Sequence, residues 1–149
     1  MAIRNIRTYG DSCLAKECKP VKEMNQKLAI LIEDMLDTMY EANGVGLAAP
    51  QVGMLRRYCV IDVGDGVIEL INPVITEKSE ETQTGNEGCL SIPDRSEVVT
   101  RPMRVSVRAQ NRYGENITVT GEGLKARALC HEIDHLDGVL YIDYAKRSK

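Results

Sequence analysis

The feature that most constrains this chain is the stretch "ALCHEIDHLDG", residues 128 to 138, which holds both histidines of a 149-residue protein. On an α-helix, residues four positions apart share a face, so His131 and His135 can direct two ring nitrogens at one point. Glu132 is displaced by about 100° around the helix axis and can reach a group beside that point. The H-E-x-x-H pattern is typical of two metal ligands and a general base that acts on water. The alternative is a pair of surface histidines on an amphipathic helix, but a chance placement of both histidines in this pattern is improbable.

A catalytic metal site usually takes three protein ligands, so a third ligand must come from elsewhere in the chain. The 14 residues after His135 contain no His and no Glu. Asp137 faces away from His135 on a helix, and Asp143 would place the site at the very end of the chain. An upstream ligand is therefore favoured. Cys89 in "EGCLS" is the first candidate, and Cys130 is the alternative, although its helical position turns it about 100° away.

The hydrophobic pattern predicts one α+β domain over residues 1–149. Apolar residues at helical spacing predict a helix over 21–41, and a second helix is expected from Leu124 to Gly138. Alternation and β-branched residues predict strands in "RYCVIDV", "VIELINPVI", "MRVSVRAQN" and "ENITVT", the first two joined by a "GDG" hairpin turn. "TEKSEETQTGN" is expected to stay near the surface. The expected order is thus an N-terminal helix, antiparallel or mixed sheets, and a C-terminal helix that carries H-E-x-x-H.

The stretch "GVGLAAPQVG", residues 44 to 53, is a poor helix interior because it combines glycines, a proline and small residues. One interpretation is an irregular loop whose backbone approaches another group closely. The other is an ordinary tight turn between a helix and a strand. On this stretch alone the tight turn is favoured.

Composition excludes several classes of protein. A net charge of −3 argues against binding nucleic acid through bulk charge, and we expect no sequence-specific nucleic-acid contact. No run of 18 apolar residues and no signal-type N-terminus is present, so we expect a soluble, cytoplasmic protein without membrane contact. Five cysteines cannot all pair and are expected to be free thiols in a reducing compartment. The basic tail "YAKRSK" is expected to be solvated.

Three segments together resemble the peptide deformylase family. That family carries G-x-G-L-A-A-x-Q, E-G-C-L-S and H-E-x-D-H in this order, and the chain has "GVGLAAPQ" (44–51), "EGCLS" (87–91) and "HEIDH" (131–135). The resemblance extends over nearly the whole chain. It implies an enzyme of protein biosynthesis that removes the formyl group from the N-terminal formyl-methionine of newly synthesised proteins and releases formate.

The resemblance also implies roles for individual residues. Cys89, His131 and His135 would bind one divalent metal ion. Glu132 would be the acid and base. The Gln51 side-chain amide and the backbone N–H of Leu90 would hold the carbonyl oxygen as it gains negative charge.

Substrate contacts follow from the helix and from the resemblance. Leu124 and Ala128 share the face of His131 and are expected to line a pocket for the methionine side chain. Arg127 is expected to lay its stem along this pocket with its head in solvent. The resemblance implies that the peptide adds as a strand against Val45 and Gly88. The glycines that flank Val45, Gly44 and Gly46, belong to the same expected substrate-binding wall.

One thiolate and two imidazoles suit zinc and also ferrous iron. The resemblance implies Fe²⁺ as the working metal, with Ni²⁺, Co²⁺ or Zn²⁺ as substitutes. The partners expected are N-formyl-Met nascent peptides and a transient ribosome contact, and we expect a monomer.

The chain departs from the common family pattern in two ways, because Cys130 stands where Gln is usual and the chain ends soon after "YIDYAKRSK". A zinc endopeptidase and an inactive metal-binding module are the alternatives. The first lacks a downstream ligand, and the second needs neither Glu132 nor Gln51.

Overall fold

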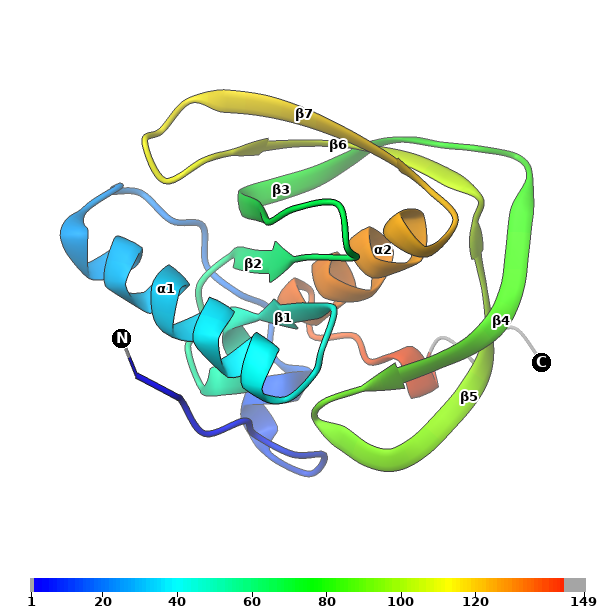
Figure 1. Cartoon of the computed structure of the whole chain (residues 1–149), viewed down its shortest axis with the longest axis horizontal. Helices are drawn as coiled ribbons and strands as arrows, with labels where there is room; N and C mark the ends of the chain where they lie inside the picture. The colour runs from blue at the N-terminus through cyan, green and yellow to red at the C-terminus, as the bar shows by residue number, and fades with distance from the viewer. Residues whose placement is uncertain (1, 144–149) are drawn as a thin grey trace.

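The computed structural model describes residues 2–143 and has the α+β architecture that the sequence predicts (Figure 1). The helices are α1 (Gln26–Glu41), α2 (Leu124–Leu136) and two short 3₁₀ helices, η1 (Ser12–Ala15) and η2 (Ala49–Val52). The strands are β1 (Gly46–Ala48), β2 (Tyr58–Ile61), β3 (Ile68–Lys78), β4 (Thr82–Cys89), β5 (Ile92–Pro102), β6 (Arg104–Gln110) and β7 (Asn116–Glu122).

The strands form two sheets. A five-stranded sheet has the order β1-β2-β3-β6-β7, and β4 pairs with β5 in a separate two-stranded sheet. Every pairing between these strands is antiparallel. In Figure 1 the long β4–β5 pair curves past α2 on the side away from α1. The four predicted strands are confirmed as β2, β3, β6 and β7, and β2 and β3 form the predicted hairpin.

The β4–β5 pair is the longest part of the structure that the sequence pattern did not reveal. The polar stretch over residues 76–86 supplies the end of β3 and the start of β4, and most of its side chains are exposed as expected. β5 is exposed along most of its first half, so apolar alternation, which marks a half-buried strand, is missing there.

The two helices pack on opposite faces of the five-stranded sheet. Side chains alternate between the faces of a strand. In β2, Tyr58 and Val60 belong to the apolar cluster built around α1. Cys59 and Ile61 belong to the cluster that contains the apolar side of α2. Both faces of β2 are therefore buried, and α2 is held between the sheet and β5.

The start of α1 corrects the predicted helix over 21–41. The helix begins at Gln26 because the side chain of Asn25 caps it, accepting a hydrogen bond from the Leu28 N–H at 2.9 Å. Met24 lies before the helix and still packs against the same cluster. The predicted end at residue 41 is confirmed, since α1 ends at Glu41, and Asn43 just after it adopts a φ of 57°.

The stretch 44–53 is more regular than the predicted loop. It contains β1, which pairs with β2, and then η2, whose C-cap residue Gly53 has a φ of 84°. All five cysteines are free, as expected. Within residues 2–143, no helix combines the length and apolar character needed to cross a bilayer. The tail "YAKRSK" lies outside the described residues.

Candidate active site

α2 carries polar side chains into the interior of the protein. Arg127, His131, Glu132 and His135 are each 8 % exposed or less, although all four can carry charge. Burying such groups is costly unless they are paired or bind an ion. α2 is therefore the helix on which chemistry is concentrated.

The buried His131 and His135 converge with Cys89, which is partly buried. One ligand atom from each of Cys89, His131 and His135 lies within 4.8 Å of the others, and Cys89 Sγ is 3.3 Å from His135 Nε2. Within residues 2–143 this is the one group of three or more His, Cys, Asp or Glu residues with such geometry. Cys89 reaches α2 because it ends β4 at an irregularity in the register between β4 and β5. One thiolate and two imidazoles are a donor set that fits a single divalent metal ion.

The alternative third ligands lie elsewhere. Cys130 is buried in the apolar cluster between α2 and the sheet, and burial raises the pKa of its thiol to about 11. Asp137 forms an ion pair with Arg57 at 2.7 Å. Asp143 accepts a hydrogen bond from the Leu140 N–H at 3.3 Å. The structure thus brings Cys89 to the two histidines and leaves the other candidates outside.

A buried carboxylate fixes the orientation of His131. Glu87 Oε1 lies 2.6 Å from His131 Nδ1, which leaves the other ring nitrogen for the cluster. Glu87 also accepts hydrogen bonds from Arg101 at 2.5 and 3.1 Å, and Arg101 in turn binds Asp134 at 2.6 Å. Burial opposes the charge on Glu87, but its hydrogen bonds with His131 and Arg101 outweigh burial and lower its pKa to about 2.

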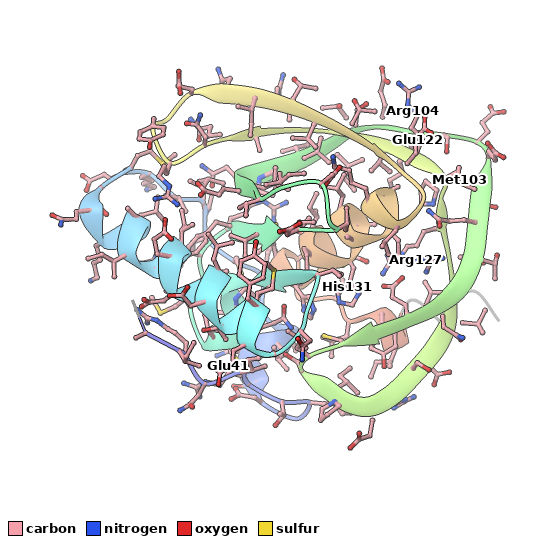
Figure 2. All side chains as sticks on the ribbon, viewed as in Figure 1. Glu41, Met103, Arg104, Glu122, Arg127 and His131 are labelled. Atoms are coloured by element: carbon pink, nitrogen blue, oxygen red, sulfur yellow. The ribbon has the colours of Figure 1, made fainter. Side chains whose placement is uncertain are left out.

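Arg127 corrects a prediction. Its head is not in solvent: the guanidinium group lies between α2 and the β4–β5 pair (Figure 2), bound to Glu87 Oε2 at 2.7 Å and to the Val99 carbonyl at 3.1 Å. The reason is electrostatic, because the buried Glu87 carboxylate is surrounded by donors and Arg127 is one of them. Arg127 still lines the cavity, as predicted.

Glu132 lies beside the donor cluster and outside it. Its side chain is 4 % exposed, and its Oε1 atom has no hydrogen-bond partner among residues 2–143. Burial raises the pKa of Glu132 to about 7, against the opposing effect of His131. Gly46 permits this position, since any Cβ at residue 46 would collide with the Glu132 carboxylate. The structure therefore agrees with the interpretation in which the backbone of the glycine-rich stretch approaches another group closely.

Gln51 is held with its amide directed at the cluster. Its Oε1 accepts a hydrogen bond from the Ala48 N–H at 2.9 Å. Its Nε2 donates to Ser91 Oγ at 3.1 Å and lies 3.4 Å from Cys89 Sγ. Gln51 is 1 % exposed and sits in η2, so the 3₁₀ turn after β1 is what positions this group.

A cavity of about 340 Å³ opens beside the cluster. It collects every predicted site residue except His135. Those residues are Gly44, Val45, Gly46, Gln51, Gly88, Cys89, Leu90, Leu124, Arg127, Ala128, His131 and Glu132. The cavity therefore joins the glycine-rich stretch, the end of β4 and one face of α2.

The two histidines differ in their electrostatic surroundings. Burial lowers the pKa of His135 well below its usual value, and the neighbouring His131 lowers it further, so the ring is neutral as a metal ligand must be. Burial alone would also lower the pKa of His131, but the acidic groups of Glu132, Cys89 and Glu87 raise it instead. This concentration of acidic groups favours a positive charge at the cluster, which a divalent cation would supply.

Sequence reasoning missed the residues that support the cluster. Glu87 and Asp134 stand inside the quoted motifs "EGCLS" and "HEIDH" without an assigned role, and Arg101 falls in the strand that was not predicted. Each motif holds an acidic residue within two positions of a predicted metal ligand, and that was the signal available. Arg101 offered no local signal.

Comparisons with known proteins point to one family. Residues 3–149 match the family model described as "Polypeptide deformylase". Peptide deformylase of Caldicellulosiruptor bescii is 56 % identical over 96 % of this chain and 86 % of its own. That of Acetivibrio thermocellus is 59 % identical over 96 % and 84 %. The crystal structure of peptide deformylase from Thermotoga maritima superposes with a TM-score of 0.95 at 46 % identity, covering 97 % of this chain and 98 % of the other.

Proposed function

This chain belongs to the polypeptide deformylase family, and from that premise we propose that it removes the formyl group from the N-terminal formyl-methionine of new chains and releases formate. The observation that carries the proposal is the cluster of Cys89 with the buried His131 and His135, and the buried Glu132 beside it, whose Oε1 has no hydrogen-bond partner among residues 2–143. A structural metal site has no use for such a carboxylate, whereas hydrolysis of an amide needs one.

Cys89, His131 and His135 are the residues that would hold the metal. Their donor atoms suit Fe²⁺, which we propose as the working ion, and also Ni²⁺, Co²⁺ and Zn²⁺. When bound, a divalent metal supplies Lewis acidity that makes water a competent nucleophile near neutral pH. Glu87 supports the site by holding His131 through Nδ1.

Glu132 is the proposed proton carrier. A pKa of about 7 lets its carboxyl group both accept and give up a proton near neutral pH. We propose that Glu132 takes a proton from the attacking water and passes it to the nitrogen that leaves as the free amine of methionine. Its burial keeps bulk water from taking this role.

Gln51 and Leu90 are proposed to stabilise the developing oxyanion. Gln51 is preorganised, because its Oε1 is fixed by the Ala48 N–H and its Nε2 faces Cys89. Leu90 follows Cys89 directly and lines the same cavity, so its backbone N–H is the second proposed donor. Donors fixed before the reaction stabilise charge that exists only in the transition state.

Two strand edges border the cavity and suit an extended peptide. β1 is the last strand of the five-stranded sheet, and β4 pairs with β5 alone. Gly44, Val45 and Gly46 approach the cavity from one side and Gly88 from the other. A substrate strand between these edges would be read through its backbone, which suits an enzyme that acts on many nascent chains. The methionine side chain would then lie against Leu124 and Ala128.

The test is formate release from formyl-Met-Ala-Ser by the full chain loaded with Fe²⁺ under anaerobic conditions. We expect formate and free Met-Ala-Ser in equal amounts, and no cleavage of unformylated Met-Ala-Ser. Cleavage of internal peptide bonds without formate would instead identify a zinc-type endopeptidase.

We also propose that the protein is a monomer in the cytoplasm and contacts the ribosome transiently. Gel filtration tests the oligomeric state, cell fractionation tests the location, and co-sedimentation tests the ribosome contact.

A further inference from the structure

A second and larger cavity, of about 650 Å³, lies at the opposite end of α1 from the catalytic one. The catalytic cavity is bordered by Asn43 and Gly44, just past the C-terminus of α1, whereas the second cavity is bordered by Asn25 and Lys27 at its N-terminus. The two cavities share no lining residue. Its volume falls within the range of small-molecule sites, which is about 300–1,000 Å³.

The inner surface of this cavity is apolar. Leu28 and Leu31 of α1 are buried there, and Val21 and Met54 are half-buried against the same apolar cluster. Tyr58 of β2, 1 % exposed, also lines the cavity. A hydrocarbon group that enters the cavity would meet side chains of like character and remove their remaining exposed area from water.

The rim of the cavity is cationic. Lys19, Lys22, Lys27 and Arg56 lie there with a single carboxylate, Glu23, in a chain whose formal net charge is −3. None of the four cations forms an ion pair with any residue in the part of the chain that is described. Four unpaired cations at one opening create a local field that attracts anions.

Two further features at this cavity favour a polar, anionic group. The first turn of α1 has no acidic residue to complement the positive end of its dipole. The Tyr58 hydroxyl is buried and has no hydrogen-bond partner among residues 2–143. A buried hydroxyl usually has such a partner, and a ligand bound beside Tyr58 can provide it.

The wall opposite α1 is fixed rather than loose. Lys19 and Arg56 are joined by a parallel backbone bridge, with the Lys19 N–H donating to the Leu55 carbonyl at 3.2 Å. The Asn72 side chain holds Val21 at both its N–H and its carbonyl, at 2.8 and 2.9 Å. The backbone that carries these cations is therefore held in position before any ligand binds.

We propose that this cavity is a binding site for an amphipathic anion, with one aliphatic tail against Leu28, Leu31 and Met54 and one carboxylate or phosphate head at Lys22 and Arg56. The apolar inner surface favours the aliphatic tail, and the cationic rim favours the anionic head group. The site is separate from the proposed catalytic chemistry and stands whether or not the chain deformylates peptides.

The test is a titration of the full zinc-loaded chain, labelled with ¹⁵N, with decanoate and with decyl phosphate, followed by amide chemical shifts. We expect saturable shifts at Lys22, Leu28, Leu31 and Tyr58, with the amides of Leu90 and Ala128 unmoved. Tighter binding of one anion identifies the head group as carboxylate or phosphate. Decan-1-ol, which has the tail without the charge, should bind at least about tenfold more weakly.

Charge reversal at the rim provides the matched comparison. Arg56→Glu and, separately, Lys22→Glu should each weaken decanoate binding by at least about tenfold. Arg104→Glu makes the same charge change at an exposed residue of β6 (labelled in Figure 2) that does not line this cavity, and it should leave binding unaltered. The proposal is overturned if decan-1-ol binds as tightly as decanoate, if both rim variants bind like the parent chain, or if the shifts centre on Leu90 and Ala128.

Discussion

The two long helices of this protein bury polar groups in different ways. α1 buries eight residues, of which only Asp34 and Thr38 are polar. Both have partners: Asp34 binds Arg4 and the Ala2 N–H, and Thr38 bonds to the Asp34 carbonyl. α2 buries ten residues, including Arg127, two histidines and Glu132.

The contrast lies in what is left unpartnered. In α2, Glu132 Oε1 and His135 Nδ1 are buried without a hydrogen-bond partner among residues 2–143. Unsatisfied buried groups reduce stability, so they persist mainly where a site needs them. The buried polar groups of α1 thus serve its own packing, whereas α2 keeps unpartnered polar groups beside the donor cluster, where the proposed chemistry needs them. The following substitutions test this division.

The largest expected effect is on Glu132, the proposed proton carrier of α2. Glu132→Gln keeps the shape of the side chain and removes its ability to accept a proton, so formate release should fall by about 10²–10⁴-fold. The metal should remain stoichiometric, because Glu132 lies outside the donor cluster. Metal analysis and formate release on the same sample decide the point, and loss of the metal together with the activity would make Glu132 structural.

The next largest effect is expected for Glu87, the carboxylate that holds His131 of α2. Glu87→Gln removes the charge that pairs with the buried guanidinium of Arg101, at a cost of about 3–5 kcal/mol in the free energy of unfolding. It also loosens His131, and metal affinity should fall by about 10–100-fold. Urea unfolding and metal competition with a chelator measure both quantities.

Glu69→Gln is the matched control, since Glu69 pairs with Arg112 away from the cluster. Its metal affinity should equal that of the parent chain. If Glu87→Gln also kept full metal affinity, the supporting role of Glu87 would be lost.

The smallest expected effect on activity belongs to α1. Met35 is fully buried in the α1 cluster, and Met35→Ala should lower the free energy of unfolding by about 2–5 kcal/mol. The kcat/KM of the folded fraction should not change, because α1 places no side chain in the donor cluster. Thermal unfolding and formate release at low temperature separate the two quantities, and a drop in kcat/KM would couple α1 to the chemistry.

Much of the fold could be predicted from the sequence because local patterns carried it. The apolar run of β2, the alternation in β6 and β7 and the helical spacing in α2 are all found in the structure. The β4–β5 pair was not predicted because polar residues dominate its exposed length. The start of α1 was placed too early because the apolar spacing continues through Met24, and only the Asn25 cap shows where the helix begins.

The candidate site, like the fold, could be predicted only where a local sequence pattern carried it. His131, Glu132 and His135 follow from helical geometry within five residues. Contacts across the chain left no such pattern: Arg101 lies 33 positions from Asp134, and Glu87 lies 44 from His131. Arg127 was placed with its head in solvent because its partner, Glu87, belongs to a strand that the pattern did not show.

The proposed metal site requires Cys89 as its third ligand. The deciding measurement is the metal content of purified Cys89→Ala and Cys130→Ala, each reconstituted with zinc and passed through a desalting column. Cys89→Ala should come out metal-free, because it removes one of three converging donors. Cys130→Ala should retain one metal per chain, because Cys130 packs in the apolar cluster. A metal-free Cys130→Ala beside a metal-loaded Cys89→Ala would contradict the account.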